Sequence, residues 1–329
     1  MTIRRRRLPG TALNLSVIAL GTVPLGGALS EDDSFRLLDA YLELGGNFID
    51  TAEVYSNWIE GLEPSLAEKR IGKWLAARGL KDQVVVATKG GHPRLGSFDV
   101  MRLSPEDILD DIDGSRERLG LETLPLYYLH RDDPARNMDE IVDALGAAVD
   151  ADKIRYLGCS NWTVPRIREA QAYAEKVDRP TFVINQMRWS LARVNPDSQK
   201  IPGLVEMDDA MRHFHRETGL AAAAYSSQAQ GFFSGAYGRS IDSPATPNGL
   251  KIKQYYYNPR NFDALDRVTK LARELGRPPT QVALAYLMSQ PFPTFPIIGT
   301  TRIDHLKESC AAYDLQLSKE QIRRLTAGL

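Results

Sequence analysis

The sequence FIDTAEVY, residues 48–55, joins a short apolar strand to a polar loop. It places a carboxylate, Asp50, at the end of the strand and a phenol, Tyr55, in the loop that follows. A carboxylate and a phenol held close together could form half of a proton-transfer site. Asp50 could equally cap the next segment, with Tyr55 packing in an ordinary loop. Which interpretation holds depends on the residues that end the neighbouring strands.

The same unit, an apolar run followed by a segment with helical spacing, repeats along the chain. Residues 104–120 show the helical half well, with Ser104 at the N-cap, Pro105 in the first turn and Gly120 at the end. We expect strands at residues 17–21, 47–50, 82–89, 124–130, 154–161, 181–186, 220–226 and 294–300. We expect helices at residues 30–46, 64–78, 104–120, 138–153, 164–177, 204–219, 262–276, 279–290, 303–312 and 318–328.

Repeated strand–helix units predict parallel strands, and at 329 residues they favour a single domain, residues 1–329, built as a (β/α)8 TIM barrel. RRRRLPGTALNLS (residues 4–16) predicts an N-terminal β-hairpin around a Pro-Gly turn, and the last two helices are additional C-terminal helices. The competing fold is an open doubly wound sheet, which would place GxGxxG after its first strand. The sequence there, GTVPLGG, lacks that spacing. Residues 232–261 show no clear periodicity, and we expect a long functional loop over the site.

Composition excludes several classes of protein. Hydrophobic residues make up 43% of the chain and charged residues 25%, as in ordinary globular proteins. The net charge of −1 argues against nucleic acid or an acidic membrane surface as a partner. Arg4–Arg7 precede an uncharged run, as in a signal peptide, but repeated Gly and Pro residues interrupt that run. The only cysteines, Cys159 and Cys310, form no metal-ligand pattern, so we expect no metal and a cytoplasmic location.

Polar residues follow several of the predicted strands. Lys89 ends VVVATK and His130 ends YYLH, and in a barrel both would lie on the same rim as Asp50 and Tyr55. A carboxylate, a lysine, a histidine and a tyrosine on one rim form a plausible acid–base site. Other strands end in further polar residues, which are Ser160, Asn161, Gln186 and Tyr225.

The order of these motifs resembles that of the aldo-keto reductase family. The resemblance rests on FIDTAEVY, VVVATK, YYLH, LGCSN, INQMRWS, AYSSQAQGFFSGAY and IIGTTRIDHLKES, with LPGTALNLSVIALGTVPLGG similar to the family's opening. It extends almost from end to end and fits the bacterial and channel-β-like branch best. It implies a catalytic tetrad of Asp50, Tyr55, Lys89 and His130. Tyr55 would be the general acid or base, with Lys89 lowering the pKa of the phenol from about 10, Asp50 holding Lys89, and His130 polarising the carbonyl.

The same resemblance implies a nicotinamide cofactor. The positions that match cofactor-binding residues of the family are Gly21, Thr22, Ser160, Asn161, Gln186, Tyr225, Ser226, Gln228, Gly231, Phe232, Ser234, Gly299, Thr300, Thr301, Arg302, His305 and Glu308. Gln228 and Ser234 could equally be ordinary loop residues. A lysine and an arginine that many relatives use for the 2′-phosphate are missing, which leaves Arg302 as its partner. We expect NADP(H), with NAD(H) as the alternative.

The substrate is less well defined. Trp58, His92, Arg131 and Trp189 lie on loops expected at the mouth, where they would suit a sugar or a flat carbonyl compound. Trp162 could line the site or pack beneath the cofactor, and His213 and His215 are expected on the surface. We expect an NAD(P)H-dependent oxidoreductase acting on an aldehyde, ketone or sugar, or on the alcohol in reverse. The alternatives are a redox-sensing regulatory subunit of channel-β type and an inactive barrel that serves as a binding module.

Overall fold

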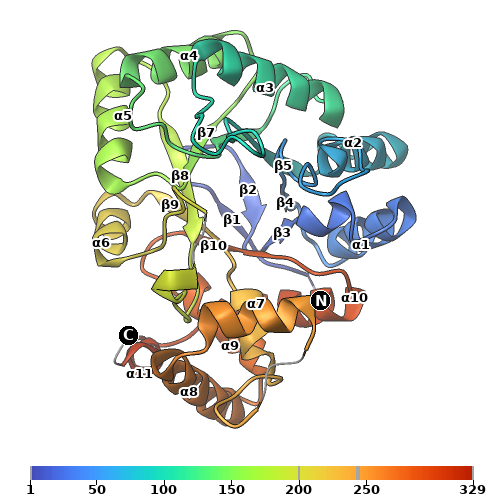
Figure 1. The fold of residues 1–329 in the computed structure, drawn as a ribbon, viewed down its shortest axis with the longest axis vertical. Coiled ribbons are helices and arrows are strands. Elements are labelled where there is room, and N and C mark those ends of the chain that lie inside the picture. Colours follow the sequence, from blue (N-terminus) through green and yellow to red (C-terminus); the bar gives the residue numbers. More distant parts are fainter. Residues whose placement is uncertain (1, 199–200, 242–244, 328–329) are drawn as a thin grey trace.

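The computed structural model describes residues 2–198, 201–241 and 245–327. Short parallel strands close into a barrel in the order β10-β3-β4-β5-β6-β7-β8-β9 (Figure 1). These strands are β3 (Ala19–Gly21), β4 (Phe48–Asp50), β5 (Val85–Gly90), β6 (Leu126–Leu129), β7 (Leu157–Ser160), β8 (Phe182–Arg188), β9 (Ala221–Tyr225) and β10 (Thr294–Ile298). The prediction of a (β/α)8 TIM barrel is therefore confirmed.

The barrel interior is filled by side chains of unequal size. Phe48 and Phe295 meet edge to face inside it, with ring centroids 5.8 Å apart. Ala221 and Ala223 of β9 are buried in the same cluster and leave room for the larger rings. Alanine has a low intrinsic preference for strands. The sequence AAAAY therefore forms a strand because small residues fit opposite large ones in a closed barrel.

An N-terminal hairpin closes one end of the barrel. Strand β1 (Arg5–Arg7) pairs antiparallel with β2 (Asn14–Ser16), as expected, and both lie behind the barrel in Figure 1. Leu8, Leu13 and Leu15 of this hairpin are buried in the same cluster as the interior residues of the barrel. The hairpin thus covers the end where the strands begin, and the opposite end remains for a site.

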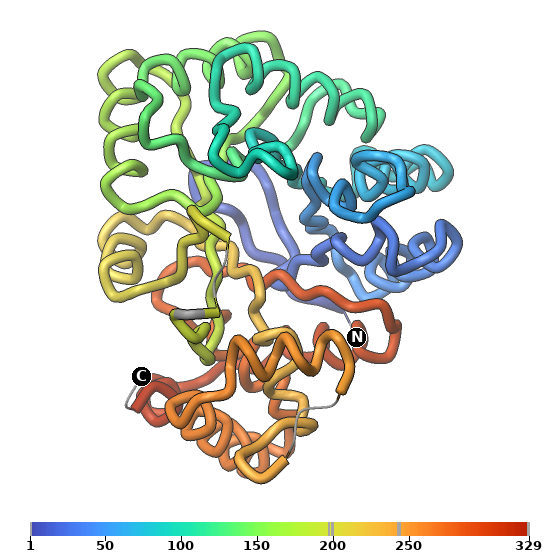
Figure 2. Tube along the Cα trace, in the orientation of Figure 1, coloured from blue at the N-terminus to red at the C-terminus, as the bar shows by residue number. Residues whose placement is uncertain are grey.

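The helices surround the barrel, and α1 and α10 lie side by side where the ring closes (Figure 2), whereas α11 packs against α8. They are α1 (Glu31–Glu43), α2 (Leu66–Arg78), α3 (Pro105–Leu119), α4 (Met138–Asp150), α5 (Val164–Lys176), α6 (Asp209–Thr218), α7 (Pro247–Tyr256), α8 (Pro259–Leu275), α9 (Pro279–Met288), α10 (Ile303–Cys310) and α11 (Lys319–Thr326). Short 3-10 turns add η1 (Val23–Gly26), η2 (Pro196–Ser198), η3 (Ala229–Ser234) and η4 (Ala311–Asp314).

Two of the expected boundaries were wrong. The helix expected at residues 204–219 begins only at Asp209, because the Asp208 side chain caps it by accepting a hydrogen bond from the backbone N–H of Met211. The loop expected at residues 232–261 contains all of α7 and the start of α8. Thr246 caps α7 and Pro247 occupies its first turn, signals that the Gly- and Ser-rich surroundings concealed. Residues 242–244 of that loop, and residue 328 at the expected end of the last helix, lie outside the described residues.

Two absences can be stated for residues 2–198, 201–241 and 245–327. None of their helices is long and apolar enough to span a bilayer. Nor do they bring together three or more His, Cys, Asp or Glu side chains that could hold a metal ion.

Candidate active site

Asp50, Lys89 and Tyr55 meet where the strands of the barrel end. The Lys89 Nζ atom lies 2.9 Å from Asp50 Oδ2, 2.9 Å from the Tyr55 hydroxyl and 2.7 Å from the backbone carbonyl oxygen of Thr51. An ammonium group has three N–H donors, and these three acceptors use all of them. The Tyr55 oxygen therefore accepts a hydrogen bond from Lys89 and keeps its own proton for another acceptor.

This cluster is withdrawn from water. The Lys89 side chain is 0% exposed and the Asp50 side chain 3%. Burial lowers the pKa of Lys89, and the Asp50 charge opposes that change. Burial, followed by the Asp50 charge, raises the pKa of Tyr55 well above 10. The effect expected of Lys89 on the pKa of this phenol is thus outweighed here, first by burial and then by the Asp50 charge.

His130 lies beside the phenol. Its ring is edge-on to that of Tyr55, with centroids 6.0 Å apart, and 4.9 Å from the ring of His92. Burial, with smaller contributions from His92 and Lys89, lowers the pKa of His130 well below 6.5, so the ring is neutral at pH 7. Its Nδ1 atom is buried and has no hydrogen-bond partner among the described residues. His130 thus presents a neutral imidazole beside Tyr55.

The loop that carries Tyr55 is fixed by close packing. Ser56 has a φ of 91°, which a residue with a side chain seldom adopts. Its hydroxyl fills the space beside Gly26, where a Cβ atom would lie 1.3 Å from Ser56 Oγ. Further along, the Asn57 side chain accepts a hydrogen bond of 2.7 Å from the backbone N–H of Ser65. A side chain at position 26 would therefore displace Ser56, the neighbour of Tyr55.

Polar residues that end the next strands lie around the tetrad. Gln186 of β8 donates from Nε2 to Asp50 Oδ1 at 2.7 Å, so it holds the second oxygen of that carboxylate. Asn161 takes a φ of 61° after β7 and donates to Ser160 Oγ at 3.1 Å. The Tyr225 hydroxyl of β9 donates to Asn161 Oδ1 at 2.8 Å. The structure thus brings Ser160, Asn161, Gln186 and Tyr225 together.

Gly21 and Thr22 lie at the end of β3, next to the tetrad. The Thr22 hydroxyl donates to the backbone carbonyl of Asp50 at 2.9 Å. A Cβ atom on Gly21 would approach Ile297 Cγ2 to 2.9 Å, so glycine keeps β3 close to β10. Both residues help to hold the backbone of Asp50 in place.

The loop after β9 curls through several residues with left-handed backbone angles. Ser226, Ala229, Gln230 and Gly231 all have φ between 48° and 97°. Successive backbone N–H groups in such a curl form a concave surface suited to an anion. Ser227, within this curl, is pinned to β10 by a 2.6 Å hydrogen bond to the Ile297 carbonyl.

The remaining residues of this loop have different surroundings. Gln228 donates to Ser309 Oγ at 3.1 Å, and Ser234 is exposed. The Phe232 ring is 0% exposed and packs against Phe233 and Tyr256, so only its backbone could face a ligand. The side chain of Phe232 therefore belongs to the core, and the expected contact with a cofactor stays a prediction for its backbone.

The segment after β10 is open to solvent. Gly299, Thr301, Arg302 and His305 are exposed, and Thr300 is half-buried. Arg302 donates from Nε to Asp304 Oδ1 at 3.0 Å. The arginine expected to bind a phosphate is therefore paired with a neighbouring carboxylate. Glu308 accepts a hydrogen bond of 2.7 Å from Thr280.

Three of the four residues expected at the mouth surround Tyr55. Trp58 is exposed and its ring lies 6.2 Å from that of Tyr55. His92 donates from Nδ1 to the Pro93 carbonyl at 2.7 Å, and burial lowers its pKa to about 4. Arg131 is 7% exposed, and its charge acts on Tyr55 and Tyr225. A neutral histidine, a tryptophan and a buried cation thus border the phenol.

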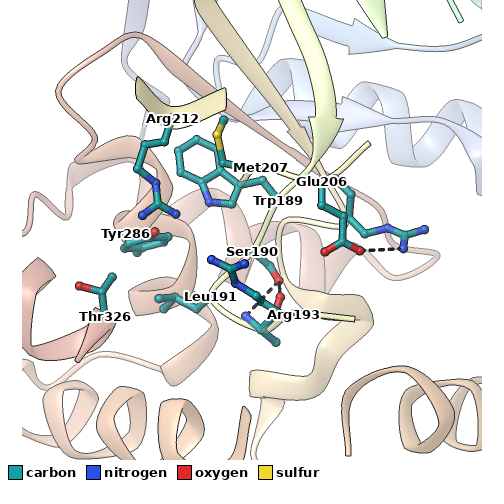
Figure 3. A pocket seen from close by; sticks show the side chains of 11 residues that line it. Trp189, Ser190, Leu191, Arg193, Glu206, Met207, Arg212, Tyr286 and Thr326 are labelled. Carbon is teal, nitrogen blue, oxygen red and sulfur yellow. Dashed lines mark hydrogen bonds and ion pairs between the residues drawn. The ribbon is translucent and has the colours of Figure 1, made fainter. Parts of the chain in front are cut away.

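Trp189 and His215 differ from their expected positions. The Trp189 ring is 3% exposed and stacks on Phe292 with centroids 5.8 Å apart, beside Tyr286 of α9 (Figure 3). His215 is 0% exposed. Its ring also stacks on Phe292, with centroids 5.2 Å apart. His213 is exposed, as expected. Both corrected residues pack between the barrel and its helices.

Trp162 also belongs to the packing. Its ring is 0% exposed, lies edge-on to Phe182 at 5.2 Å and donates from Nε1 to the Arg131 carbonyl at 3.1 Å. Sequence reasoning missed Phe98, whose ring lies 6.0 Å from that of His92. It also missed the Thr51 carbonyl, since a backbone acceptor has no signal in the sequence.

A (β/α)8 barrel with a buried acid–base cluster at the ends of its strands defines the class of this protein. The family model described as "Aldo/keto reductase family" matches residues 17–328. The chain belongs to the aldo/keto reductase family, and this relationship makes it an oxidoreductase of a family that generally uses NAD(P)H.

Curated relatives extend over most of the chain. An uncharacterized oxidoreductase YrpG of Bacillus subtilis (strain 168) is 32% identical, over 96% of this chain and 92% of the relative. An aryl-alcohol dehydrogenase [NADP(+)] of Phanerodontia chrysosporium is 30% identical, over 98% of this chain and 85% of the relative. The protein tas of Escherichia coli (strain K12) is 28% identical, over 98% of this chain and 96% of the relative.

Proposed function

We propose that this protein interconverts a small carbonyl compound and its alcohol with NADP(H), and that Tyr55 is the general acid or base. One observation carries the proposal. The three N–H groups of Lys89 are all bound, one of them to Tyr55, so the phenol keeps its own proton. That proton also forms a hydrogen bond with Asp50, and it can pass to a substrate oxygen that takes the place of this acceptor. A substrate seated over Tyr55 would also meet the ring of His130.

The residues around the tetrad fit a nicotinamide cofactor. Ser160, Asn161 and Gln186 offer donors and acceptors for a carboxamide, and the Tyr225 ring stands beside them. The backbone curl at residues 226–231 suits the pyrophosphate. Arg302 suits the 2′-phosphate of NADPH, although Asp304 competes for the same guanidinium. The bound cofactor would supply or accept the hydride.

The chain's own residues handle the proton and the substrate oxygen. Tyr55 donates its proton to that oxygen in reduction and takes one back in oxidation. Lys89 orients the phenol, and Asp50 and Gln186 hold Lys89 in turn. Neutral His130 orients the carbonyl by donating a hydrogen bond, which an imidazole with a lowered pKa can do at pH 7 without carrying charge.

The experiment that tests this proposal is titration of the purified protein with NADPH and NADH, followed by assays with aldehydes, ketones, sugars and alcohols. Cofactor-dependent turnover near the typical range, about 1–10³ per second, supports it. Tight cofactor binding without turnover of any substrate would instead favour the redox-sensing subunit. Absence of binding to either cofactor would favour the inactive barrel.

The two directions should differ in their dependence on pH. Because burial raises the pKa of Tyr55 well above 10, the phenol stays protonated through neutral pH and reduction should be nearly constant between about pH 6 and 9. Alcohol oxidation needs the phenolate, so its kcat/KM should rise about tenfold per pH unit over the same range. A plateau in oxidation that begins below about pH 8 would show that the pKa of Tyr55 is depressed instead.

Arg131 predicts the charge of the substrate. It is buried beside Tyr55, donates to the Gly203 carbonyl at 3.4 Å, and forms no ion pair with any residue that the structure describes. A buried cation without a counter-charge is costly, so a substrate with a carboxylate would be favoured. We expect kcat/KM for 4-carboxybenzaldehyde to exceed that for benzaldehyde roughly tenfold, since a charge-assisted hydrogen bond contributes ~1.5–3 kcal/mol.

Arg131→Met should remove this preference through KM, Arg131→Lys should restore part of it, and Arg94→Met, at an exposed arginine, should leave it unchanged. If the unmodified protein had the same kcat/KM for the two aldehydes, the role of Arg131 would be refuted, but the proposed function would not. Turnover of neither would count against the proposed function itself.

A further inference from the structure

A cavity lies on the flank of the barrel, and none of the tetrad residues lines it. It has a volume of about 180 Å³ and is bordered by the residues after β8, by α6, by α9 and by the end of α11 (Figure 3). By the same measure one water molecule needs about 10–15 Å³, so the cavity has room for a small ligand. Its walls carry three arginines, Arg188, Arg193 and Arg212, and the aromatic residues Trp189 and Tyr286.

Two of the three arginines in this cavity, Arg193 and Arg212, are poorly neutralised by the residues that the structure describes. Arg188 is paired with Glu206 at 3.3 Å. Arg212 reaches only Asp209, at 3.8 Å, and that carboxylate is 92% exposed. The Nε atom of Arg212 is buried and has no hydrogen-bond partner among the described residues. Arg193 forms no ion pair within the same part of the chain. Glu206, a carboxylate in the cavity wall, is thus taken up by Arg188, whereas Arg193 and Arg212 bring donors and positive charge that this wall does not match.

Two more arginines of α8 reinforce this charge. Arg267 donates from Nε to the Leu325 carbonyl at 3.1 Å, next to Thr326 of the cavity wall. Its Nη2 atom is a second buried donor without a partner in the described residues. Burial, and then the charge of Arg193, lower the pKa of Arg260, with Asp209 opposing this change and Arg267 adding to it. Arg193 and Arg267 thus each lie close enough to repel Arg260.

The cluster has the chemistry of an oxyanion site. A buried N–H group without an acceptor costs about 1–3 kcal/mol, and like charges in proximity add to that cost. The planar guanidinium fork matches the oxygens of a phosphate, and it binds them through paired hydrogen bonds. We propose that this flank cavity binds a phosphate group, as inorganic phosphate or as a small phosphate monoester, through Arg193 and Arg212.

The proposed phosphate ligands lie apart from the expected cofactor residues. The Cζ atom of Arg188, at one edge of the cavity, lies 5.9 Å from the ring centroid of Tyr225. Arg193, by contrast, is bonded through its backbone to Asn261 of α8, and Arg212 is on α6. Arg302, the expected partner of the cofactor phosphate, follows the far end of β10. Phosphate bound in the flank cavity therefore would not compete with NADPH.

Isothermal titration calorimetry with inorganic phosphate tests the proposal, at an ionic strength held constant with KCl and with NADPH either absent or saturating. We expect one saturable site whose dissociation constant is the same in both conditions. Arg193→Gln and Arg212→Gln should each weaken binding at least tenfold. Arg36→Gln, at an exposed arginine of α1 on another side of the barrel, is the matched control and should change it less than twofold. Glycerol 3-phosphate and acetate, titrated in parallel, show whether a monoester binds more tightly than free phosphate and whether a carboxylate suffices.

Heat signals that vanish with saturating NADPH, or that persist in both arginine variants, would overturn the proposal, because phosphate would then be binding at the cofactor residues. Acetate binding as tight as phosphate would overturn the assignment to phosphate. Thermal unfolding of each variant in buffer alone verifies that it is folded. Arg193 is the safer variant, since its side chain makes no hydrogen bond to other described residues.

Discussion

Phenylalanine at position 55 is expected to lower kcat for carbonyl reduction by about 10²–10⁴-fold, the usual effect of losing a positioned general acid. Phenylalanine has no hydroxyl proton to give, and it loses the hydrogen bond that the Tyr55 oxygen accepts from Lys89. Phenylalanine fills nearly the same space, and the Ser56–Gly26 contact that fixes the loop is untouched. Cofactor affinity should therefore change less than about twofold. Steady-state kinetics and fluorescence titration with NADPH measure the two quantities.

Tyr127→Phe is the matched control for this prediction. The Tyr127 hydroxyl is also buried, but it has no hydrogen-bond partner in the part of the chain that the structure describes. It points among the residues between the barrel and its helices, as shown by the Asp111 and Glu68 charges that act on it. Its removal should leave kcat within about threefold of the unmodified protein. If Tyr55→Phe retained as much activity as Tyr127→Phe, the proton would have to come from elsewhere.

The barrel and the convergence of the tetrad could be predicted from the sequence because both follow from local periodicity. Each strand is a short apolar run whose last residue is polar, and parallel strands in a closed barrel bring those ends to one rim. Asp50, Lys89 and His130 are 40 residues or so apart in sequence, yet this rule alone places them together. Helix starts could be predicted where a cap precedes an apolar face, as at Ser104. Helix starts could not be predicted where the capping residue lies within a polar segment, as Asp208 does.

Properties that depend on which way a side chain faces could not be predicted. Trp189 follows β8 and was expected at the mouth, but its ring stacks on Phe292, more than 100 residues later. His215 was expected on the surface for the same reason, since its helix carries many charges and its neighbour Phe292 is distant in sequence. The direction of the pKa shift of Tyr55 is a balance of burial against charge, and the extent of burial is known only from the packed structure.

Methionine at position 89 is expected to abolish turnover and to lower the free energy of unfolding by about 3–5 kcal/mol. Both members of the Lys89–Asp50 pair are buried, so removing the ammonium leaves the Asp50 carboxylate with Gln186 but without a counter-charge. An ionised carboxylate that is buried without a counter-charge is costlier than a neutral carboxyl group, so more stability is lost at neutral than at acidic pH. Urea unfolding should accordingly show a larger difference from the unmodified protein at about pH 8 than at about pH 5.

The double variant Asp50→Asn/Lys89→Met separates charge from packing. Asparagine is neutral and its Oδ1 atom can still accept the hydrogen bond that Gln186 donates to Asp50. Because the uncompensated carboxylate is gone, more than half of the stability lost in Lys89→Met should return, and the dependence on pH should disappear. Turnover should remain absent, since no ammonium orients Tyr55. If the double variant were as unstable as the sum of its single changes, the two charges would not act as a pair, and the buried lysine would serve the phenol alone.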